Sequence, residues 1–467
     1  MEPLSLSPET HLAEAYPAQK AYYAAGHTQA LSRRKASLQK LLSLLEKEET
    51  ALLEALAADL GKPPFEAYAS EVGFVKAELR LTLRKLKKWS RPRRVKSPLF
   101  TWPSRSYIRP ESKGVTLIIA PWNYPLQLLL APAVAALAAG NTAVLKPSEF
   151  TPHTARLVEK LVAQHFDPGL LTVVQGPGHE VVPRLMKAHR FDHVFFTGST
   201  AVGRAVAELA APQLVPTTLE LGGKSPAVIH PSARLKVAVR RIAFGKWLNA
   251  GQTCVAPDYL LVPRGQIDEV TETFRGTLKH FFPQGALQSP DYGNLIHDKH
   301  FARQKDYLND GKVLLGGEYD EGQGQIAPTL LGEVNPAAAV MQEEIFGPIL
   351  PVIPYDTEEE ARAFIQKYDP PLALYVFAED RAAQRRFTEQ IAFGGGAINT
   401  SVLHLSNPHL PFGGIAQSGM GQYHGRFGFD TFSHQKALLN NATWLDIPLK
   451  YPPYGRKALA QIKKIMG

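Results

Sequence analysis

The only cysteine of the chain, Cys254, is the side chain best suited to covalent chemistry. It closes the run Gly-Gln-Thr-Cys at 251–254, which follows a segment with helical periodicity. A lone cysteine is more often an inert core residue than a nucleophile. The glycine-flanked turn favours the second interpretation, because it lets a substrate approach and exposes backbone N–H groups that favour a thiolate and stabilise an oxyanion. Cys254 is therefore a candidate nucleophile for a carbonyl carbon.

Attack on a carbonyl needs a second donor for the oxyanion and a base that activates water for product release. Asn123, in the run Pro-Trp-Asn-Tyr-Pro after a strand, has the donor, although an asparagine there is more often a turn residue or helix cap. Glu220, in Glu-Leu-Gly-Gly-Lys, also follows a strand, where open α/β sheets bind ligands. Its apolar surroundings predict the raised pKa that a base near neutral pH needs. An ion pair with Lys224 or Lys246 is the alternative.

Three further segments carry groups suited to a dinucleotide. Phe-Thr-Gly-Ser-Thr-Ala-Val-Gly at 196–203 predicts a strand, a glycine turn and a helix start whose N–H groups bind anions. It is not the G-x-G-x-x-G fingerprint, and such a strand-turn-helix is common. Lys-Pro-Ser-Glu at 146–149 and Glu-Glu-Ile-Phe-Gly-Pro at 343–348 place a lysine and carboxylates at strand ends. These groups suit ribose hydroxyls, and are equally typical of surface charges.

Short apolar strands alternate with helices along most of the chain, which predicts parallel, doubly wound sheets covered on both faces. A domain boundary is expected near Leu221, where a new strand follows two glycines. The expected strands are 115–120, 142–145, 171–174, 194–196, 217–219, 227–229, 259–262, 349–355 and 373–377. The expected helices are 33–60, 71–89, 124–139, 154–165, 201–210, 236–248, 267–280 and 358–368.

Composition and charge exclude several classes of protein. With 467 residues, 45% apolar and 20% charged, the chain is a folded protein of two or three domains rather than a peptide or a disordered chain. A single cysteine excludes an intramolecular disulfide and thiolate clusters, which fits a reducing compartment. The net charge of +9 and the basic cluster at 85–96 are interpreted as solvated charge rather than a nucleic-acid site. The start of the chain lacks a signal-peptide pattern and no spanning segment is found, so a cytoplasmic protein without an integral membrane anchor is expected.

Taken together, the motifs resemble those of the NAD(P)-dependent aldehyde dehydrogenases. The five runs around Asn123, Glu149, Gly198, Glu220 and Cys254 occur in the family's order, followed by Glu-Glu-Ile-Phe-Gly-Pro and by Pro-Phe-Gly-Gly at 411–414. The resemblance covers nearly the whole chain. The ending, with Ser-Gly-Met-Gly, Tyr-His-Gly, Phe-Asp-Thr-Phe-Ser-His and Tyr-Pro-Pro-Tyr, looks like the class 3 branch, as does the short N-terminus. That branch implies a homodimer that uses NAD or NADP to oxidise aromatic or medium- to long-chain aliphatic aldehydes to acids.

The resemblance also implies a role for each candidate residue. Cys254 matches the nucleophile, Glu220 the general base and Asn123 the oxyanion donor beside the backbone N–H of Cys254. The implied cofactor-binding residues are Trp122, Lys146, Ser148, Glu149, Gly198, Ser199, Gly203, Leu221, Gly222, Glu344 and Phe346. The implied substrate-pocket residues are Tyr124, Phe244 and Phe412, and no metal is expected. Glu149 can accept from a ribose 2′-OH and would repel a 2′-phosphate that Lys146 can attract, so both cofactors are expected to work, NAD better.

The implied fold has a dinucleotide-binding domain at 1–90 and 111–220, a catalytic domain at 221–411, and an oligomerisation element. The last combines an arm at 91–110 with 425–450, whose pairing with a partner's sheet edge would bury it as a shared strand. The basic, partly amphipathic stretch from Arg456 to Lys464 leaves a peripheral membrane contact open.

Three other functions stay open at this stage. A CoA-acylating aldehyde dehydrogenase would pass the thioester to a thiol, but it needs no glutamate at position 220. A catalytically silent structural or binding protein on the same fold would not require Cys254, Glu220 and Asn123 together. A nucleic-acid binder would depend only on the basic cluster and the net charge, and would lose binding steeply with salt.

Overall fold

The first of two large sheets supports the N-terminal half of the chain. The computed structural model of the protein describes residues 8–448 and 451–466. Its six-stranded sheet has the order β17-β7-β6-β3-β4-β5, parallel except for β17. Buried apolar runs such as Val-Thr-Leu-Ile-Ile in β3 form its centre, as expected for strands covered on both faces. These strands are β3 (Val115–Ile119), β4 (Thr142–Lys146), β5 (Leu171–Val173), β6 (His193–Thr197), β7 (Thr217–Glu220) and β17 (Gly419–Met420).

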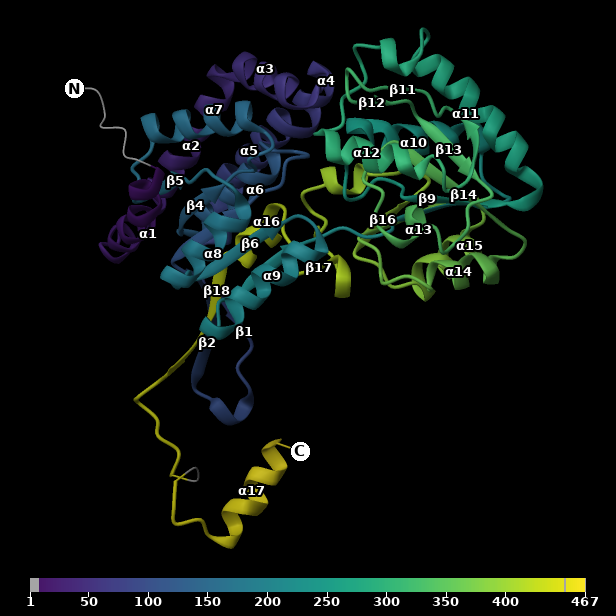
Figure 1. Cartoon of the computed structure of the whole chain (residues 1–467). Coiled ribbons are helices and arrows are strands. Elements are labelled where there is room, and N and C mark those ends of the chain that lie inside the picture. Colours follow the sequence, from purple (N-terminus) through teal and green to yellow (C-terminus); the bar gives the residue numbers. More distant parts are fainter. Residues whose placement is uncertain (1–7, 449–450, 467) are drawn as a thin grey trace.

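Helices cover both faces of this sheet. Helices α6 and α7 pack on one face, with α2, α3 and α5 outside them, and α1, α8 and α9 pack on the other (Figure 1). Gly140 ends α6 with φ 95°, the left-handed conformation that a glycine at a helix C-terminus adopts readily. The helices of this half are α1 (Pro8–Ala24), α2 (Leu31–Lys47), α3 (Glu49–Leu60), α4 (Pro64–Ala67), the π-helical turn η1 (Tyr68–Val72), α5 (Gly73–Trp89), α6 (Gln127–Ala139), α7 (Pro152–His165), α8 (Gly178–Ala188), α9 (Thr200–Ala210) and α16 (Gly425–Thr431).

A second doubly wound sheet supports the other half. Its seven strands have the order β10-β13-β14-β9-β8-β15-β16 and are parallel except for the β10–β13 pair. Helices α10 and α11 contact one face, and α14 and α15 the other (Figure 1). The strands are β8 (Pro226–Ile229), β9 (Tyr259–Pro263), β10 (Lys312–Leu315), β13 (Thr329–Gly332), β14 (Ile349–Tyr355), β15 (Ala373–Phe377) and β16 (Gly395–Ile398), beside a hairpin of β11 (Tyr319–Asp320) and β12 (Gln325–Ile326). The helices are α10 (Leu235–Trp247), α11 (Ile267–Phe281), α12 (Asp298–Tyr307), α13 (Ala339–Gln342), α14 (Glu358–Ile365) and α15 (Arg381–Gln390).

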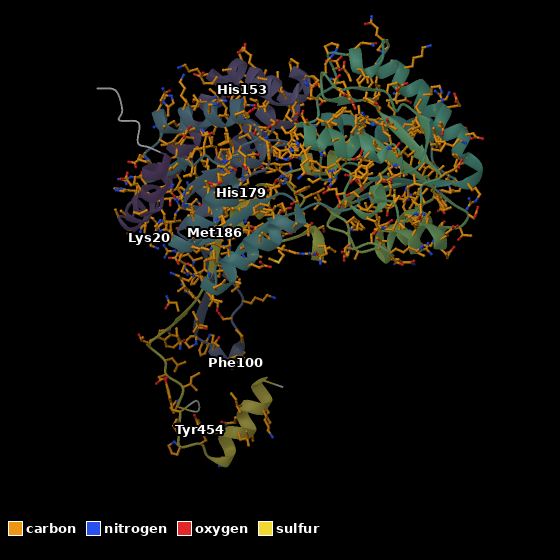
Figure 2. The ribbon with its side chains drawn as sticks, in the orientation of Figure 1. Lys20, Phe100, His153, His179, Met186 and Tyr454 are labelled. Carbon is orange, nitrogen blue, oxygen red and sulfur yellow. The ribbon has the colours of Figure 1, made fainter. Side chains whose placement is uncertain are left out.

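A three-stranded antiparallel arm projects away from both halves (Figure 1). It consists of β1 (Arg93–Val95), β2 (Ser104–Ser112) and β18 (Ser433–Asn441), so the segment expected as an arm pairs with the later segment of its own chain. Beyond it lies α17 (Arg456–Met466). Exposed aromatic side chains gather here, including Phe100 and Tyr454 (Figure 2). Within residues 8–448 and 451–466, no helix is long and apolar enough to cross a membrane.

The structure confirms the alternation of strands and helices and corrects several boundaries. The single helix expected at 33–60 is two helices, α2 and α3, which meet at Glu48, where φ is −97° and ψ 16°. The apolar period continues across this break, so periodicity alone does not reveal it. The helix expected from Tyr124 begins at Gln127, because residues 121–126 form a loop over the sheet edge. Helices α1, α8, α12 and α15 were not expected.

Candidate active site

A strained turn positions Cys254. After α10 the chain passes through Asn249 and Ala250, which both have left-handed φ values of 54° and 52°, and then Gly251 at 79°. A Cβ on Gly251 would lie 2.1 Å from the carbonyl oxygen of Gly347, so this close approach requires glycine. Left-handed conformations at non-glycine residues are costly and are concentrated at functional sites. The turn directs Cys254 towards the carboxyl ends of the first sheet.

The surroundings of Cys254 act on its thiol in opposite directions. Burial raises the pKa of the thiol well above its usual range, and the charges of Glu344 and Glu220 raise it further. The backbone N–H groups of Cys254 and Val255 lie against the sulfur and lower the pKa. These two N–H groups are donors of the kind that stabilise an anion formed on or beside the sulfur.

Glu220 ends β7 between β6 and β17. The residue is 2% exposed, and neither carboxyl oxygen has a hydrogen-bond partner among the described residues. Burial raises the pKa of this carboxyl well above its usual range. The alternative, an ion pair with Lys224 or Lys246, is wrong, because neither lysine contacts these oxygens and Lys224 lies 2.5 Å from Asp258 instead. The predicted raised pKa is confirmed, and the carboxyl is free to act on a bound molecule.

Asn123 lies in the loop between β3 and α6, where two side chains and one backbone carbonyl fix it in place. Its Nδ2 donates to the Gln252 carbonyl over 3.0 Å, which ties the loop to the Cys254 turn. Its backbone carbonyl accepts from Lys62 Nζ at 3.0 Å and Asn249 Nδ2 at 2.9 Å. An amide nitrogen carries two hydrogens, so one is left for a ligand after the bond to Gln252.

Cys254 and Glu220 lie where two cavities meet. One has a volume of about 510 Å³ and several polar and charged residues in its wall; the other has about 160 Å³ and a mostly apolar wall. Thr197, Glu220 and Cys254 line both cavities, whereas Asn123 lines the larger one. A molecule in either cavity therefore reaches the same sulfur and the same carboxyl group.

The larger cavity contains most of the predicted cofactor residues. Those in its wall are Trp122, Gly198, Ser199, Leu221, Gly222, Glu344 and Phe346. Gly203 lies behind this wall, and a Cβ there would meet Leu221 at 2.5 Å. Lys146 ends β4, and Ser148 and Glu149 follow it beside α8, outside the lining of the cavity. There Glu149 accepts from the Gly178 N–H at 2.9 Å and from Lys146 at 3.0 Å.

The larger cavity has the polar groups that a dinucleotide needs. At one end the N-terminus of α9 opens into it, capped by Ser199, with the Arg204 guanidinium alongside, which suits a pyrophosphate. At the other end, a Cβ on Gly222 would lie 1.8 Å from the Glu344 carboxylate, so only glycine lets that carboxylate enter. Carboxylates of this kind accept from ribose hydroxyls. The residues present therefore fit NAD or NADP.

Aromatic contacts hold Phe346 in the wall of this cavity. Its φ of 54° is left-handed, and His300 Nε2 donates to its carbonyl at 2.8 Å. The Trp122 ring meets the Phe346 ring edge-on at 5.3 Å. Trp122 and Phe346 thus form one rigid side of the cavity, next to Glu344.

The smaller cavity brings together all three predicted substrate-pocket residues, Tyr124, Phe244 and Phe412. Tyr124 Oη lies 2.6 Å from Thr253 Oγ1, beside the nucleophile. The Phe412 ring stacks on His424 at 5.1 Å. Phe244 is 40% exposed and lies towards the mouth. The cavity is an apolar tunnel that ends at Cys254.

The sequence did not point to several residues of the tunnel wall. Tyr423, His424, Gln127 and Glu66 also line it. Burial raises the pKa of Glu66 to about 7. These side chains come from three separate segments, α4, α6 and the residues before α16, and nothing in the sequence marks the three segments as neighbours. The π-helical turn at Tyr68–Val72 adjoins the tunnel, but a helical period does not reveal such a turn in the sequence.

One cluster of possible metal ligands lies outside the site. Among the residues whose positions are described, His230, Glu358 and Asp380 bring one ligand atom each within 4.8 Å. Arg386 pairs with Glu358 at 2.7 Å and with Asp380 at 3.6 Å. These carboxylates are already neutralised by a cation, so the cluster is an ion-pair network.

Comparison with known proteins decides the family. The sequence profile of the aldehyde dehydrogenase family matches residues 5–438. The chain belongs to the aldehyde dehydrogenase family. It is 46% identical to a 4,4'-diaponeurosporen-aldehyde dehydrogenase of Staphylococcus aureus, over 94% of this chain and 95% of that one. Aldehyde dehydrogenase family 3 member A2 of Macaca fascicularis is 42% identical over 92% of this chain and 89% of its own.

A solved structure shows the same fold. The "Substrate bound state of Staphylococcus Aureus AldH" has a TM-score of 0.95 and 44% identity, and covers 98% of this chain and 99% of that one. The comparisons confirm the predicted family, its class 3-like branch and the α/β aldehyde dehydrogenase fold. Members of the family are oxidoreductases that oxidise aldehydes to acids with NAD or NADP.

Proposed function

We propose that this aldehyde dehydrogenase acts through a thioester on Cys254, with Glu220 as the base that releases the acid. The observation that carries the proposal is the position of Cys254 and Glu220 in the shared wall of the polar cavity and the apolar tunnel. An aldehyde in the tunnel and a nicotinamide in the cavity would meet at the sulfur from opposite sides.

The first step belongs to Cys254 and the donors around it. The thiolate adds to the aldehyde carbon, and the new oxyanion accepts from Asn123 Nδ2 and the backbone N–H of Cys254. NAD or NADP would be held by Trp122, Glu344, Phe346 and the start of α9, and would accept the hydride that leaves the former aldehyde carbon, since no side chain can accept it. After oxidation the acyl group stays on Cys254 as a thioester.

Glu220 performs the second step. Its raised pKa and its lack of hydrogen-bond partners among the described residues suit a carboxylate that takes a proton from water near neutral pH. Attack of that water on the thioester frees the acid and returns the thiol. This buried, unpaired carboxyl favours hydrolysis over transfer to CoA, because transfer to a thiol needs no water-activating base at this position.

The tunnel favours apolar aldehydes. Aromatic rings of Tyr124, Phe244 and Phe412 form part of its mostly apolar wall, and its volume is about 160 Å³. The substrates we infer are aromatic or medium- to long-chain aliphatic aldehydes. The name of the Staphylococcus aureus relative, which refers to an aldehyde of diaponeurosporene, supports this class.

For the cofactor, we infer that both NAD and NADP work and that NAD is preferred. Burial raises the pKa of Glu149, but hydrogen bonds from backbone N–H groups and from Lys146 lower it by more. The pKa of this carboxyl is therefore below its usual value. The carboxylate is therefore charged at neutral pH. It can accept from a ribose 2′-OH and repels a 2′-phosphate, while Lys146 offsets part of the repulsion.

We further infer a cytoplasmic homodimer with the expected division into domains. The proposed domains are a dinucleotide-binding domain at 1–90 and 111–220, a catalytic domain at 221–411 and an oligomerisation element at 91–110 and 425–450. Two later segments join the first of these, because β17 pairs with β7 and α16 packs on α6. The arm supports a dimer because it projects from its own chain and carries exposed apolar side chains (Figure 1). Those side chains include Leu99, Phe100, Trp102, Leu438, Leu439 and Trp444.

Turnover of hexanal and benzaldehyde tests the function. The native protein should reduce NAD, and less efficiently NADP, and release the free acid, whereas Cys254→Ala should do neither while still binding cofactor. Equal or better catalytic efficiency with NADP would contradict the cofactor preference. If no aldehyde reduces either cofactor although both bind, the fold has been kept for a binding role.

A further inference from the structure

A fully buried ion pair lies directly beneath the loop that carries Asn123. Lys62 Nζ is 2.5 Å from Glu71 Oε1, and both side chains are 0% exposed. The pair is local in sequence, because Lys62 follows Gly61, which ends α3, and Glu71 lies in the π-helical turn. A glutamate in this turn faces inward, towards the loop between β3 and α6.

The remaining hydrogen-bonding atoms of the pair all serve that loop. Glu71 Oε2 accepts from the backbone N–H groups of Leu126 at 2.8 Å and Gln127 at 3.3 Å. Lys62 Nζ donates to the Asn123 carbonyl at 3.0 Å. The two ends of the loop are therefore held by one buried carboxylate and one buried ammonium.

The Lys62 ammonium also lies over the ring of Tyr124, which follows Asn123 in the loop. Lys62 Nζ is 4.2 Å from the centroid of the Tyr124 ring, a cation–π contact. The hydroxyl of Tyr124 contacts Thr253 beside the nucleophile. Lys62 thus contacts the backbone of the proposed oxyanion donor and a ring of the tunnel wall.

We propose that the Lys62–Glu71 pair is the positioning group for the oxyanion-binding amide of Asn123. The proposal rests on the function proposed above. A buried ion pair is a poor way to stabilise a fold, since the desolvation of two charges offsets most of their attraction. Its directional hydrogen bonds, in contrast, fix a backbone carbonyl and two N–H groups at once. The pair holds residues 123–127 so that Asn123 Nδ2 reaches the oxyanion beside Cys254.

A double-mutant cycle tests this assignment. The four proteins are the native chain, Asn123→Ala, Lys62→Met and the double variant, since methionine keeps the length of the lysine stem without its charge. The probe is acylation of Cys254 by 4-nitrophenyl acetate, measured as the burst of nitrophenolate, which forms the same kind of oxyanion and needs no cofactor. Single-turnover oxidation of hexanal with NAD is the second measurement.

If Lys62 acts through Asn123, its effect should vanish when Asn123 is absent. We expect Asn123→Ala to slow acylation about 10²-fold or more. Lys62→Met should slow it roughly 10-fold to 100-fold in the native background, as a displaced catalytic group does, and less than about 3-fold in the Asn123→Ala background. If Lys62→Met slows acylation by the same factor in the native and the Asn123→Ala backgrounds, the assignment is overturned.

Lys76→Met is the matched control. Lys76 is also a buried lysine, 6% exposed, but its ammonium pairs with Glu49 at 2.7 Å and lies over the Tyr68 ring rather than on the loop at 123–127. This variant should lower the melting temperature and leave the acylation burst rate unchanged. A burst rate lowered as much by Lys76→Met as by Lys62→Met would make the effect of Lys62 a general loss of stability and contradict the assignment.

The same cycle can be made with Glu71→Gln in place of Lys62→Met. Glu71→Gln should likewise slow acylation in the native background and have little effect in the Asn123→Ala background. Unfolding of both Lys62→Met and Glu71→Gln, under conditions where Lys76→Met is folded, would make the pair a stability element and overturn its positioning role. An unchanged rate in Asn123→Ala would instead contradict the proposed role of Asn123 itself. The two failures are thereby distinguished.

Discussion

Glu78 makes the stability of this protein depend on pH in a direction that can be worked out. The side chain is 6% exposed behind the tunnel wall, where one oxygen accepts from the Gly425 N–H at 2.9 Å. Burial raises the pKa of Glu78 to about 7 from its usual 4.5, against the opposing effect of that hydrogen bond. The folded protein therefore keeps a proton on Glu78 between pH 4.5 and 7 that the unfolded chain has lost.

The sign follows from this difference in bound protons. Below pH 4.5 Glu78 is protonated in both the folded and the unfolded protein, so it does not lower the free energy of unfolding. As the pH rises the free energy of unfolding falls, and the full loss is reached above pH 7. At about 1.4 kcal/mol per pKa unit, the loss is about 3 kcal/mol. Glu78→Gln removes it while keeping an acceptor for Gly425, so the variant should match the native protein at pH 5 and be more stable at pH 8.5.

Differential scanning calorimetry at the two pH values measures the effect. At about 2.1 cal/mol/K per residue, the unfolding entropy of 467 residues is about 1 kcal/mol/K, so the variant should melt about 3 °C higher at pH 8.5. Glu54→Gln, which changes an exposed glutamate of α3, should show no such dependence. A variant that is less stable than the native protein at pH 8.5, or equally shifted at pH 5, would refute the reasoning.

Three further predictions concern the site. Because the pKa of the Cys254 thiol is raised, its alkylation by iodoacetamide should still be accelerating above pH 9, and a plateau below pH 8 would contradict this. Glu149→Gln should raise the efficiency ratio of NADP to NAD severalfold, measured side by side with hexanal; an unchanged ratio would show that the carboxylate does not contact the ribose. Phe244→Ala should raise KM for hexanal about fivefold, for roughly 1 kcal/mol of lost apolar contact, and leave KM for acetaldehyde nearly unchanged. A similar rise for both aldehydes would place Phe244 outside the substrate path.

Much of the site could be predicted because its parts are local in sequence. The runs around Asn123, Glu220 and Cys254 each follow a strand or helix whose apolar pattern is plain, and the carboxyl ends of parallel strands gather at one sheet edge. The raised pKa of Glu220 was likewise predictable, since its neighbours in the chain are apolar. The sheets follow from the alternation of elements.

The rest depends on contacts that no local pattern encodes. Lys62 follows the end of α3 and Glu71 lies in the π-helical turn, and no local pattern shows that the two side chains meet in the interior. The partner of Lys224 is Asp258, which lies on a different element, so the sequence suggested Glu220 instead. The break at Glu48 is hidden because the helical period continues through it.

The most direct test of the account is the fate of the acyl group in Glu220→Gln. Mixed with NAD and excess hexanal, this variant should form about one equivalent of NADH per Cys254 and then stall, and mass spectrometry should find one hexanoyl group on Cys254. The native protein under the same conditions should turn over continuously, release hexanoic acid and accumulate less acyl-enzyme. Continuous turnover by Glu220→Gln at the native rate, or a stalled variant without an acyl group on Cys254, would contradict the roles of both residues.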